Sequence, residues 1–267
     1  MKKFCKIKIH PLLIPFFLFY LLQGNIFFFL GMLFFVTLHE VGHCIMAISF
    51  GTKVKQIWFT PIGERAIIQG LEIPSLLKRQ IVFFAGPLIS ICMAIICMVC
   101  RNRVFAEFNL ILFLFNILPF LPLDGGNIVL HWIGSKCGIL RTASILVKIS
   151  KGFGYFLIGI GILQVILYPF NISLLVIGCY IVYSNKKEYL QITYRTYQAL
   201  LADHTTIKQV QQLYTKRDVK LGELVARMNF DRYFFYCSMK DNKVEWKSQK
   251  EIMELLLKKG AEGYVWQ

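Results

Sequence analysis

The chain has 267 residues, of which 56% are hydrophobic and only 17% are charged, a composition typical of a membrane protein and not of a soluble enzyme. Its net charge of +15 could indicate nucleic-acid binding, but the basic residues of the first part lie between apolar runs, as expected from membrane topology. We therefore expect no nucleic-acid partner.

Acidic residues divide the chain into two parts, because residues 1–185 contain five of them and residues 186–267 contain ten. We predict a transmembrane domain (1–187), a linker helix (188–202) and a cytosolic regulatory domain (203–267). The fold class is then mainly α, a polytopic membrane protein with a small α/β C-terminal domain. The eight cysteines lie mostly inside apolar runs, so they are expected to be free and reduced.

The first predicted membrane helix is the apolar run Pro11–Leu22, which follows four lysines in the first ten residues. The run lacks the small-x-small cleavage site of a signal peptide, so we expect a retained helix. Because a membrane span needs about 20 residues, the helix should extend back to about Ile7.

The second predicted span, Ile26–Phe50, is almost wholly apolar but contains the motif Leu38-His39-Glu40-Val41-Gly42-His43. Residues four apart share one face of a helix, so His39 and His43 can bind one metal ion with Glu40 beside it. Ionisable groups are costly inside a membrane, and a cluster of them therefore indicates a functional site.

Two short segments after this span have the composition of strands. Val54–Phe59 and Arg65–Ile68 flank the turn signal Pro61-Ile62-Gly63. They form either a hairpin at the membrane surface near the site or a plain amphipathic loop, because periodicity over runs this short is weak evidence.

The third and fourth predicted spans are Gln80–Cys100 and Val104 to about Leu130. Gly86-Pro87 should bend the third span or allow close packing on a neighbouring helix. Pro119, Pro122 and Asp124-Gly125-Gly126 cannot continue a regular helix, and irregular backbone at membrane depth is tolerated only where it lines a protein interior or a wet cavity. A second component of the site is therefore expected in the fourth span.

A basic loop up to Lys151 leads to two further predicted spans, Gly152–Tyr168 and Phe170–Ser184, so that six spans are expected. With the N-terminus inside the cell, most Lys and Arg residues fall on the cytosolic side and only Arg101 and Arg103 fall outside. Both termini should therefore be cytosolic, and the metal site should lie nearer the inner face.

A catalytic zinc ion uses three protein ligands and leaves a fourth position open. Besides Glu40, the acidic residues within the predicted spans are Glu107, at the outer end of the fourth span, and Asp124, at the depth of the histidines. Asp124 is the expected third ligand, and Glu40 can pass a proton from an activated water to the leaving amine of a peptide.

Two further polar residues have open roles. Asn116 holds either the substrate backbone or the developing oxyanion, or it bonds the backbone freed by Pro119. His131, at the edge of the fourth span, is either a metal ligand or an ordinary interfacial polar residue.

The C-terminal part alternates between helix and strand. After a connecting helix over Tyr189–Leu201, the pattern predicts a helix Leu221–Met228, a strand Tyr233–Met239, a turn at Asp241-Asn242, a strand Val244–Trp246 and a helix Gln249–Lys259. This order resembles one cystathionine-β-synthase (CBS) repeat. Such repeats usually pair and often bind adenine nucleotides, so the resemblance implies a homo-oligomer and ATP binding; a generic α/β docking domain is the alternative.

The two membrane motifs together resemble the site-2 protease family of intramembrane zinc metalloproteases. The resemblance rests on the segments Leu38–His43 and Asn116-Ile117-Leu118-Pro119-Phe120-Leu121-Pro122-Leu123-Asp124-Gly125. It implies that His39, His43 and Asp124 are the zinc ligands and that Glu40 is the general base. Gly86-Pro87 also resembles a family motif, although Ser90 stands where many members have Asn, and this position has no assigned role.

The domain order resembles the branch of the family that acts in sporulation. This resemblance implies cleavage of the membrane-associated pro-sequence of pro-sigma-K in the mother cell, together with inhibitory and scaffolding membrane partners. The alternatives are a protease for an anti-sigma factor or a signal-peptide remnant, and a non-proteolytic zinc transporter or scaffold. A transporter would need polar residues along several spans, and the sequence has almost none beyond the cluster.

Overall fold

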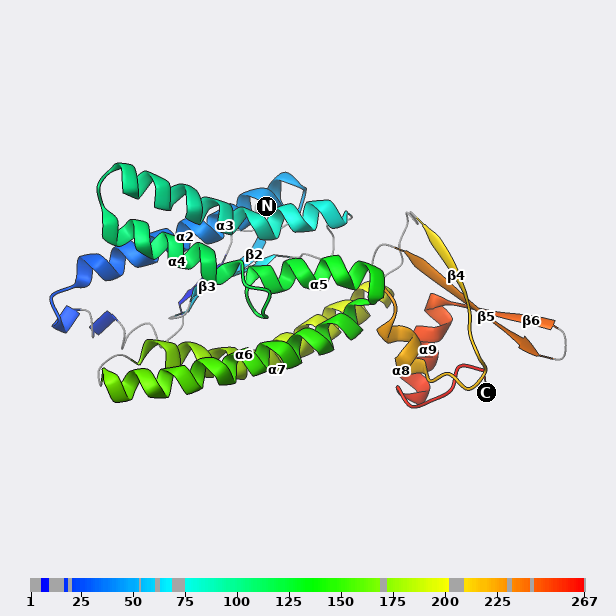
Figure 1. The fold of residues 1–267 in the computed structure, drawn as a ribbon. Helices are drawn as coiled ribbons and strands as arrows, with labels where there is room; N and C mark the ends of the chain where they lie inside the picture. Colours follow the sequence, from blue (N-terminus) through cyan, green and yellow to red (C-terminus); the bar gives the residue numbers. More distant parts are fainter. Residues whose placement is uncertain are drawn as a thin grey trace. The chain divides into compact units, whose positions relative to one another are not determined.

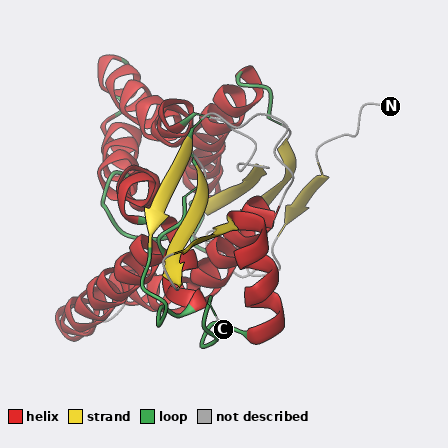
Figure 2. Ribbon diagram, turned by 90° about the vertical axis from the view of Figure 1, so that its right-hand side faces the viewer, coloured by secondary structure: helices red, strands yellow, loops and turns green. Residues whose placement is uncertain are grey.

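The computed structural model describes residues 6–9, 17–18, 21–52, 54–60, 63–68, 75–168, 172–201, 209–229, 232–240 and 243–266. Helices dominate, and the strands form two three-stranded sheets (Figures 1 and 2). The chain forms two compact units, Met1–Ile128 and Val129–Gln267. The predicted division into functional domains at residues 187 and 202 stays a prediction.

The helices of the first unit are α2 (Ile26–Ser49), α3 (Leu76–Val99), α4 (Arg103–Asn116) and the beginning of α5 (Asp124–Cys137). Helix α2 packs closely on α3 because Gly42 has no side chain: a Cβ there would lie 2.6 Å from Ile89 and 3.0 Å from the Ala85 carbonyl oxygen. Within the described residues, α2, α3 and α6 are long and apolar enough to cross a membrane. The predicted second and third spans correspond to α2 and α3, whereas the count of six spans stays a prediction.

The fourth predicted span is broken, as expected, but at the prolines and not at the glycines. Helix α4 ends at Asn116, residues 117–123 are irregular, and a new helix starts at Asp124. Gly125 and Gly126 lie inside the first turn of α5, where a Cβ would come within 2.1 Å of the Ile117 carbonyl oxygen and 2.4 Å of the Phe120 carbonyl oxygen. The glycines let the irregular segment fold back onto the new helix.

The first sheet has the strand order β1-β2-β3, with β1 at Lys6–Ile9, β2 at Val54–Thr60 and β3 at Gly63–Ile68. Strands β2 and β3 are antiparallel, which confirms the hairpin over the amphipathic loop. Strand β1 pairs in parallel with β2, so the predicted extension of the first helix back to Ile7 is wrong. Alternating Lys and Ile suits a strand better than a lipid-facing helix. Most of the predicted Pro11–Leu22 helix lies outside the described residues.

The second unit begins with two long paired helices, α6 (Ile139–Leu167) and α7 (Ser173–Leu201). The predicted basic loop before Lys151 is the first part of α6, and the predicted sixth span and linker helix form one continuous helix. The sequence between Ile139 and Lys151 contains no Gly or Pro that would end a helix, and its buried residues recur at helical spacing. The two helices pack closely at Gly161, where a Cβ would lie 2.5 Å from the Leu175 backbone nitrogen.

The second unit continues with β4 (Val210–Tyr214), α8 (Leu221–Ala226), β5 (Tyr233–Lys240), β6 (Lys243–Ser248) and α9 (Gln249–Lys259). The predicted strand Tyr233–Met239 and helix Gln249–Lys259 match β5 and α9, the predicted strand Val244–Trp246 lies within β6, and the predicted turn lies outside the described residues. Strand β4 was not predicted; it pairs in parallel with β5, and β5 is antiparallel to β6. The resemblance to a CBS repeat stays a prediction.

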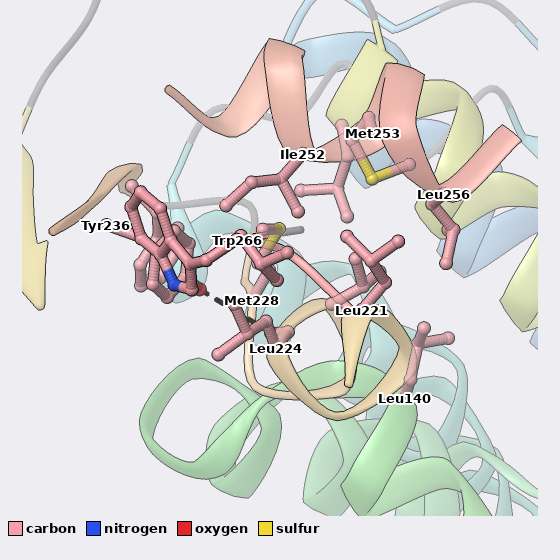
Figure 3. Packing of buried hydrophobic residues seen from close by; sticks show 13 residues of the cluster. Leu140, Leu221, Leu224, Met228, Tyr236, Ile252, Met253, Leu256 and Trp266 are labelled. Atoms are coloured by element: carbon pink, nitrogen blue, oxygen red, sulfur yellow. Dashed lines mark hydrogen bonds between the residues drawn. The ribbon is translucent and has the colours of Figure 1, made fainter. Parts of the chain in front are cut away.

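One hydrophobic core joins the tail, which comprises residues 209–266, to the ends of the two long helices (Figure 3). Leu140 of α6 and Leu200 of α7 are buried with Leu221, Tyr236, Met253 and Trp266. The buried Gln249 side chain donates to the Leu200 carbonyl oxygen and accepts from the Phe234 backbone N–H. The tail therefore packs directly on the cytosolic ends that were predicted for these helices. The described cysteines are free, as predicted.

Candidate metal centre

Helix α2 presents the two histidines of the motif on one face, four residues apart. Their side chains are buried, with 3% of His39 and 5% of His43 exposed. The two Nε2 atoms are 3.3 Å apart. Asp124 Oδ2 lies 3.1 Å from His39 Nε2 and 3.2 Å from His43 Nε2, so the structure brings together the three ligands that the sequence predicted.

Asp124 reaches the histidines because it is the first residue of α5. The chain leaves α4, folds back over residues 117–123 and starts a helix with its N-terminal turn at the site. A carboxylate is favourable in the first turn of a helix, where the backbone N–H groups carry partial positive charge. The break at Pro119 and Pro122 thus delivers the third ligand.

The Nδ1 atom of each imidazole, which faces away from Asp124, has a partner on α3. His43 Nδ1 lies 2.7 Å from the Val82 carbonyl oxygen, and His39 Nδ1 lies 2.8 Å from Ser90 Oγ. A carbonyl oxygen can only accept, so His43 Nδ1 carries a proton, and Nε2 is the atom that presents a lone pair when the ring is neutral. Partners of this kind fix the orientation of metal-binding histidines. Sequence reasoning assigned no role to Ser90; its position four residues after Gly86 was the available signal.

The geometry of the three atoms fits a zinc ion. Zinc binds His nitrogen and carboxylate oxygen at about 2.0–2.2 Å in a tetrahedron, which places neighbouring ligand atoms roughly 3.3–3.5 Å apart. The three observed separations, 3.1, 3.2 and 3.3 Å, are close to one face of such a tetrahedron. A lone pair and a carboxylate oxygen at this distance also repel each other unless a cation lies between them.

Gly86 leaves room for the ion. A Cβ at this position would lie 2.2 Å from His43 Nε2 and 2.6 Å from His39 Nε2. The close approach explains why α3 has a glycine here, and Pro87 continues within the same helix. Gly86-Pro87 was predicted either to bend the third span or to allow close packing, and the structure shows the close packing.

The remaining predicted residues have different positions. Glu40 is half-buried and adjacent to His39 on α2. Asn116 is the last residue of α4, and its Nδ2 donates to the Leu112 carbonyl oxygen at 3.0 Å, a bond within its own helix and not to backbone freed by Pro119. Glu107 is exposed on α4, and within the described residues His131 is not part of the group of potential ligands that contains His39, His43 and Asp124.

Comparisons with known proteins agree with this site. The profile of peptidase family M50 matches residues 27–103, which include both histidines, Glu40 and Ser90 but not Asp124. A zinc metalloprotease of Methanocaldococcus jannaschii is 25% identical over 222 residues, which cover 78% of this chain and 62% of that protein. Stage IV sporulation protein FB of Bacillus subtilis is 28% identical over 234 residues, covering 83% of this chain and 80% of that protein.

A solved structure also matches the fold. The site-2 protease from Methanocaldococcus jannaschii has a TM-score of 0.58 and 25% sequence identity, over 68% of this chain and 90% of that one. The fold, the His-His-Asp group and the sequence similarities agree with one another. The chain is a membrane protein that is similar to the site-2 proteases of peptidase family M50, whose profile matches residues 27–103.

Proposed function

We propose that the protein is an intramembrane zinc endopeptidase, in which His39, His43 and Asp124 bind zinc and Glu40 is the general acid and base. The observation that carries this proposal is the group of three ligand atoms, 3.1 to 3.3 Å apart, that α2 and α5 bring together from positions 81 to 85 residues apart in the sequence. A half-buried carboxylate beside two buried imidazoles is costly in an apolar setting, and ionisable groups of this kind within a membrane are mostly functional.

The residues have distinct tasks in peptide hydrolysis. Zinc supplies Lewis-acid chemistry that activates water near neutral pH and stabilises the negative charge developing on the scissile carbonyl. Glu40 accepts a proton from the attacking water and delivers it to the nitrogen of the leaving amine. Val82 and Ser90 hold the two imidazole rings by their Nδ1 atoms. Asn116 is proposed to bind the substrate backbone through the carbonyl oxygen of its side chain.

The proposed substrate is a membrane-associated pro-sequence of the pro-sigma-K type. Its cleavage would release an active transcription factor during sporulation. Support comes from the similarity to stage IV sporulation protein FB, which extends over 80% of that protein. In this proposal the protein lies in the mother-cell membrane with both termini in the cytosol, and inhibitory and scaffolding membrane proteins control it. An anti-sigma factor or a signal-peptide remnant is the alternative substrate.

The test of the activity is processing of membrane-bound pro-sigma-K by the co-expressed full-length protein. Glu40→Gln should abolish the processed band while the purified protein still contains zinc, because Glu40 is not a ligand. Asp124→Asn should lose both the processed band and the bound zinc. A zinc chelator should stop processing by the wild type. Unchanged processing by Glu40→Gln would falsify the mechanism. Zinc uptake by vesicles without cleavage of any candidate would favour transport.

We also propose that the C-terminal domain forms the homo-oligomer contact. The sheet has one face on the core, and its other face is called the outer sheet face. Among the described strand residues this face contains no charged residue; it consists of Val210, Gln212, Tyr214, Tyr233, Phe235, Cys237, Met239, Val244, Trp246 and Ser248. Its apolar residues Val210, Tyr214, Met239, Val244 and Trp246 are 49% to 66% exposed.

The size of the outer sheet face suits a second copy of the same domain. The face has four aromatic side chains, and an aromatic side chain contributes about 150–250 Å² when it is fully buried. A stable interface buries about 800 Å² per partner, whereas large apolar patches on monomers are unusual and mostly functional. ATP binding by this domain stays a prediction from the sequence resemblance; isothermal titration of the full-length protein with ATP is its test.

A further inference from the structure

Helix α3 contacts the histidine pair at three positions separated by one turn each. The Val82 carbonyl oxygen accepts from His43 Nδ1, Gly86 faces both Nε2 atoms, and Ser90 Oγ lies against His39 Nδ1. Four residues correspond to about 6 Å along a helix, so the two partners on α3 lie about 12 Å apart and bracket the glycine. The rings converge at Nε2 and are held from opposite ends at Nδ1.

The two outer partners differ in chemistry. Val82 uses a backbone carbonyl, which only accepts and which no substitution removes. Ser90 uses a hydroxyl, which both donates and accepts and which depends on the side chain. Ser90 is 1% exposed and His39 is 3% exposed, so water has little access to replace this bond. The contact at His39 Nδ1 therefore comes from one side-chain hydroxyl group.

We propose that Ser90 is a positioning residue that holds the His39 ring with its proton on Nδ1 and its lone pair on Nε2, ready for the metal. This inference rests on the proposed zinc site. Without the hydroxyl, the buried Nδ1–H loses its acceptor, and the ring is free to rotate or to place its proton on Nε2. Either change removes a ligand that now lies 3.1 Å from Asp124 Oδ2.

The experiment measures metal binding by the full-length protein in detergent, without reference to cleavage. Ser90→Ala should weaken zinc affinity about 10- to 100-fold, the usual effect of removing such a partner, as measured by competition with a chromogenic chelator. Ser90→Thr keeps the hydroxyl and should restore the affinity. The visible spectrum of the Co²⁺-loaded protein should change in Ser90→Ala and be normal in Ser90→Thr.

A buried hydroxyl elsewhere provides the matched control. Ser184 is 5% exposed, and its hydroxyl bonds only within helix α7 among the contacts that the structure describes, donating to the Tyr180 carbonyl oxygen at 2.8 Å. Ser184→Ala should leave zinc affinity and the Co²⁺ spectrum unchanged. Metal-free Ser90→Ala should melt at the temperature of the metal-free wild type, which separates a positioning role from a folding role. If threonine is too large for the site, this comparison and the Co²⁺ spectrum of Ser90→Ala still test the positioning role.

The outcomes separate this inference from the proposed function. Zinc affinity of Ser90→Ala within twofold of the wild type, with an unchanged Co²⁺ spectrum, overturns the positioning role and leaves the zinc site standing. Continued cleavage by Glu40→Gln overturns the catalytic proposal and leaves the role of Ser90 standing. Wild-type protein that binds neither zinc nor Co²⁺ overturns both.

Discussion

At the scale of single residues, the candidate metal centre depends on an absent side chain as much as on its three proposed ligands. Gly86 lies where α3 passes the two Nε2 atoms, and a side chain at this position would come within 2.2 Å of His43 Nε2. The two imidazole rings are each held at Nδ1 by α3, which limits how far their Nε2 atoms can move apart. The site therefore has a fixed size.

The residue-scale prediction is that Gly86→Ala empties the zinc site without unfolding the protein. The added methyl group would lie 2.2 Å from His43 Nε2 and 2.6 Å from His39 Nε2, the two nitrogen atoms that would hold the metal. Zinc per protein, measured by mass spectrometry of the purified protein, should fall from about one to well below a half, a loss of roughly tenfold or more in affinity and about 1.4 kcal/mol or more.

Gly159→Ala is the control for this prediction. Gly159 also lies in an apolar helix, but nothing lies within 4 Å of the place that its Cβ would occupy. The control should bind zinc like the wild type. A Gly86→Ala protein with a full complement of zinc would show that the rings move aside and that the site is not fixed.

At the scale of elements, glycines on one face of α6 set how closely the two long helices approach. Gly154 and Gly161 are seven residues apart and face α7, whereas Gly159 faces away. Small residues at this spacing allow backbones to come close, which is how helices in a membrane gain packing energy. The same device packs α2 on α3 at Gly42.

The element-scale prediction compares Gly161→Ala with Gly159→Ala. The first places a Cβ 2.5 Å from the Leu175 backbone nitrogen, so α6 and α7 must separate and lose about 1–3 kcal/mol of packing. In Gly159→Ala the added Cβ has no atom within 4 Å, and the higher helix propensity of alanine should stabilise α6 by up to about 1 kcal/mol. Thermal unfolding in detergent should show a lower midpoint for Gly161→Ala and an equal or higher one for Gly159→Ala; the reverse order contradicts the packing.

At the scale of the whole molecule, Trp266 packs into the hydrophobic core of the second unit. Trp266 is buried, its Nε1 donates to Thr215 Oγ1 at 3.2 Å, and its carbonyl oxygen accepts from Arg217 at 3.1 Å. The core that it joins also contains residues of α6 and α7, so the stability of the tail and of the two long helices is shared.

The prediction at this scale uses two tryptophans of opposite exposure. Trp266→Ala should destabilise the tail by about 3–5 kcal/mol, because it empties a buried position. Trp246→Ala, at a side chain that is 50% exposed, should change stability by less than about 1 kcal/mol. Hydrogen exchange of α8 and α9 in the full-length protein measures the difference, and equal protection in the two variants contradicts it.

Trp246→Ala also tests the outer sheet face. If a second copy covers this face, the variant should shift the protein towards the monomer in detergent-corrected light scattering while its fold is unchanged. Met253→Leu, a volume-conserving change in the core of the same domain, is the control and should keep the oligomer. A wild type that is already monomeric rejects the proposed contact.

Spacing and residue type alone predicted the three candidate metal ligands. Histidines four apart in an apolar run share one face of a helix, and Asp124 was the acidic residue of the later spans at the same depth, so the ligand set followed from spacing and cost of burial. The helix boundaries around prolines, the hairpin as one of two alternatives, and the alternating tail also followed from local patterns.

Tertiary structure decided what depends on contacts between distant segments. Strand β1 pairs with residues about 50 positions later, and β4 becomes a strand beside β5; neither pairing has a local signal. The roles of Gly86 and Ser90 exist only because α3 packs against α2, since a close approach and a bond across 51 residues cannot be read from periodicity. The candidate ligands could therefore be predicted from the sequence, whereas the residues that pack against them on α3 became visible only in the fold.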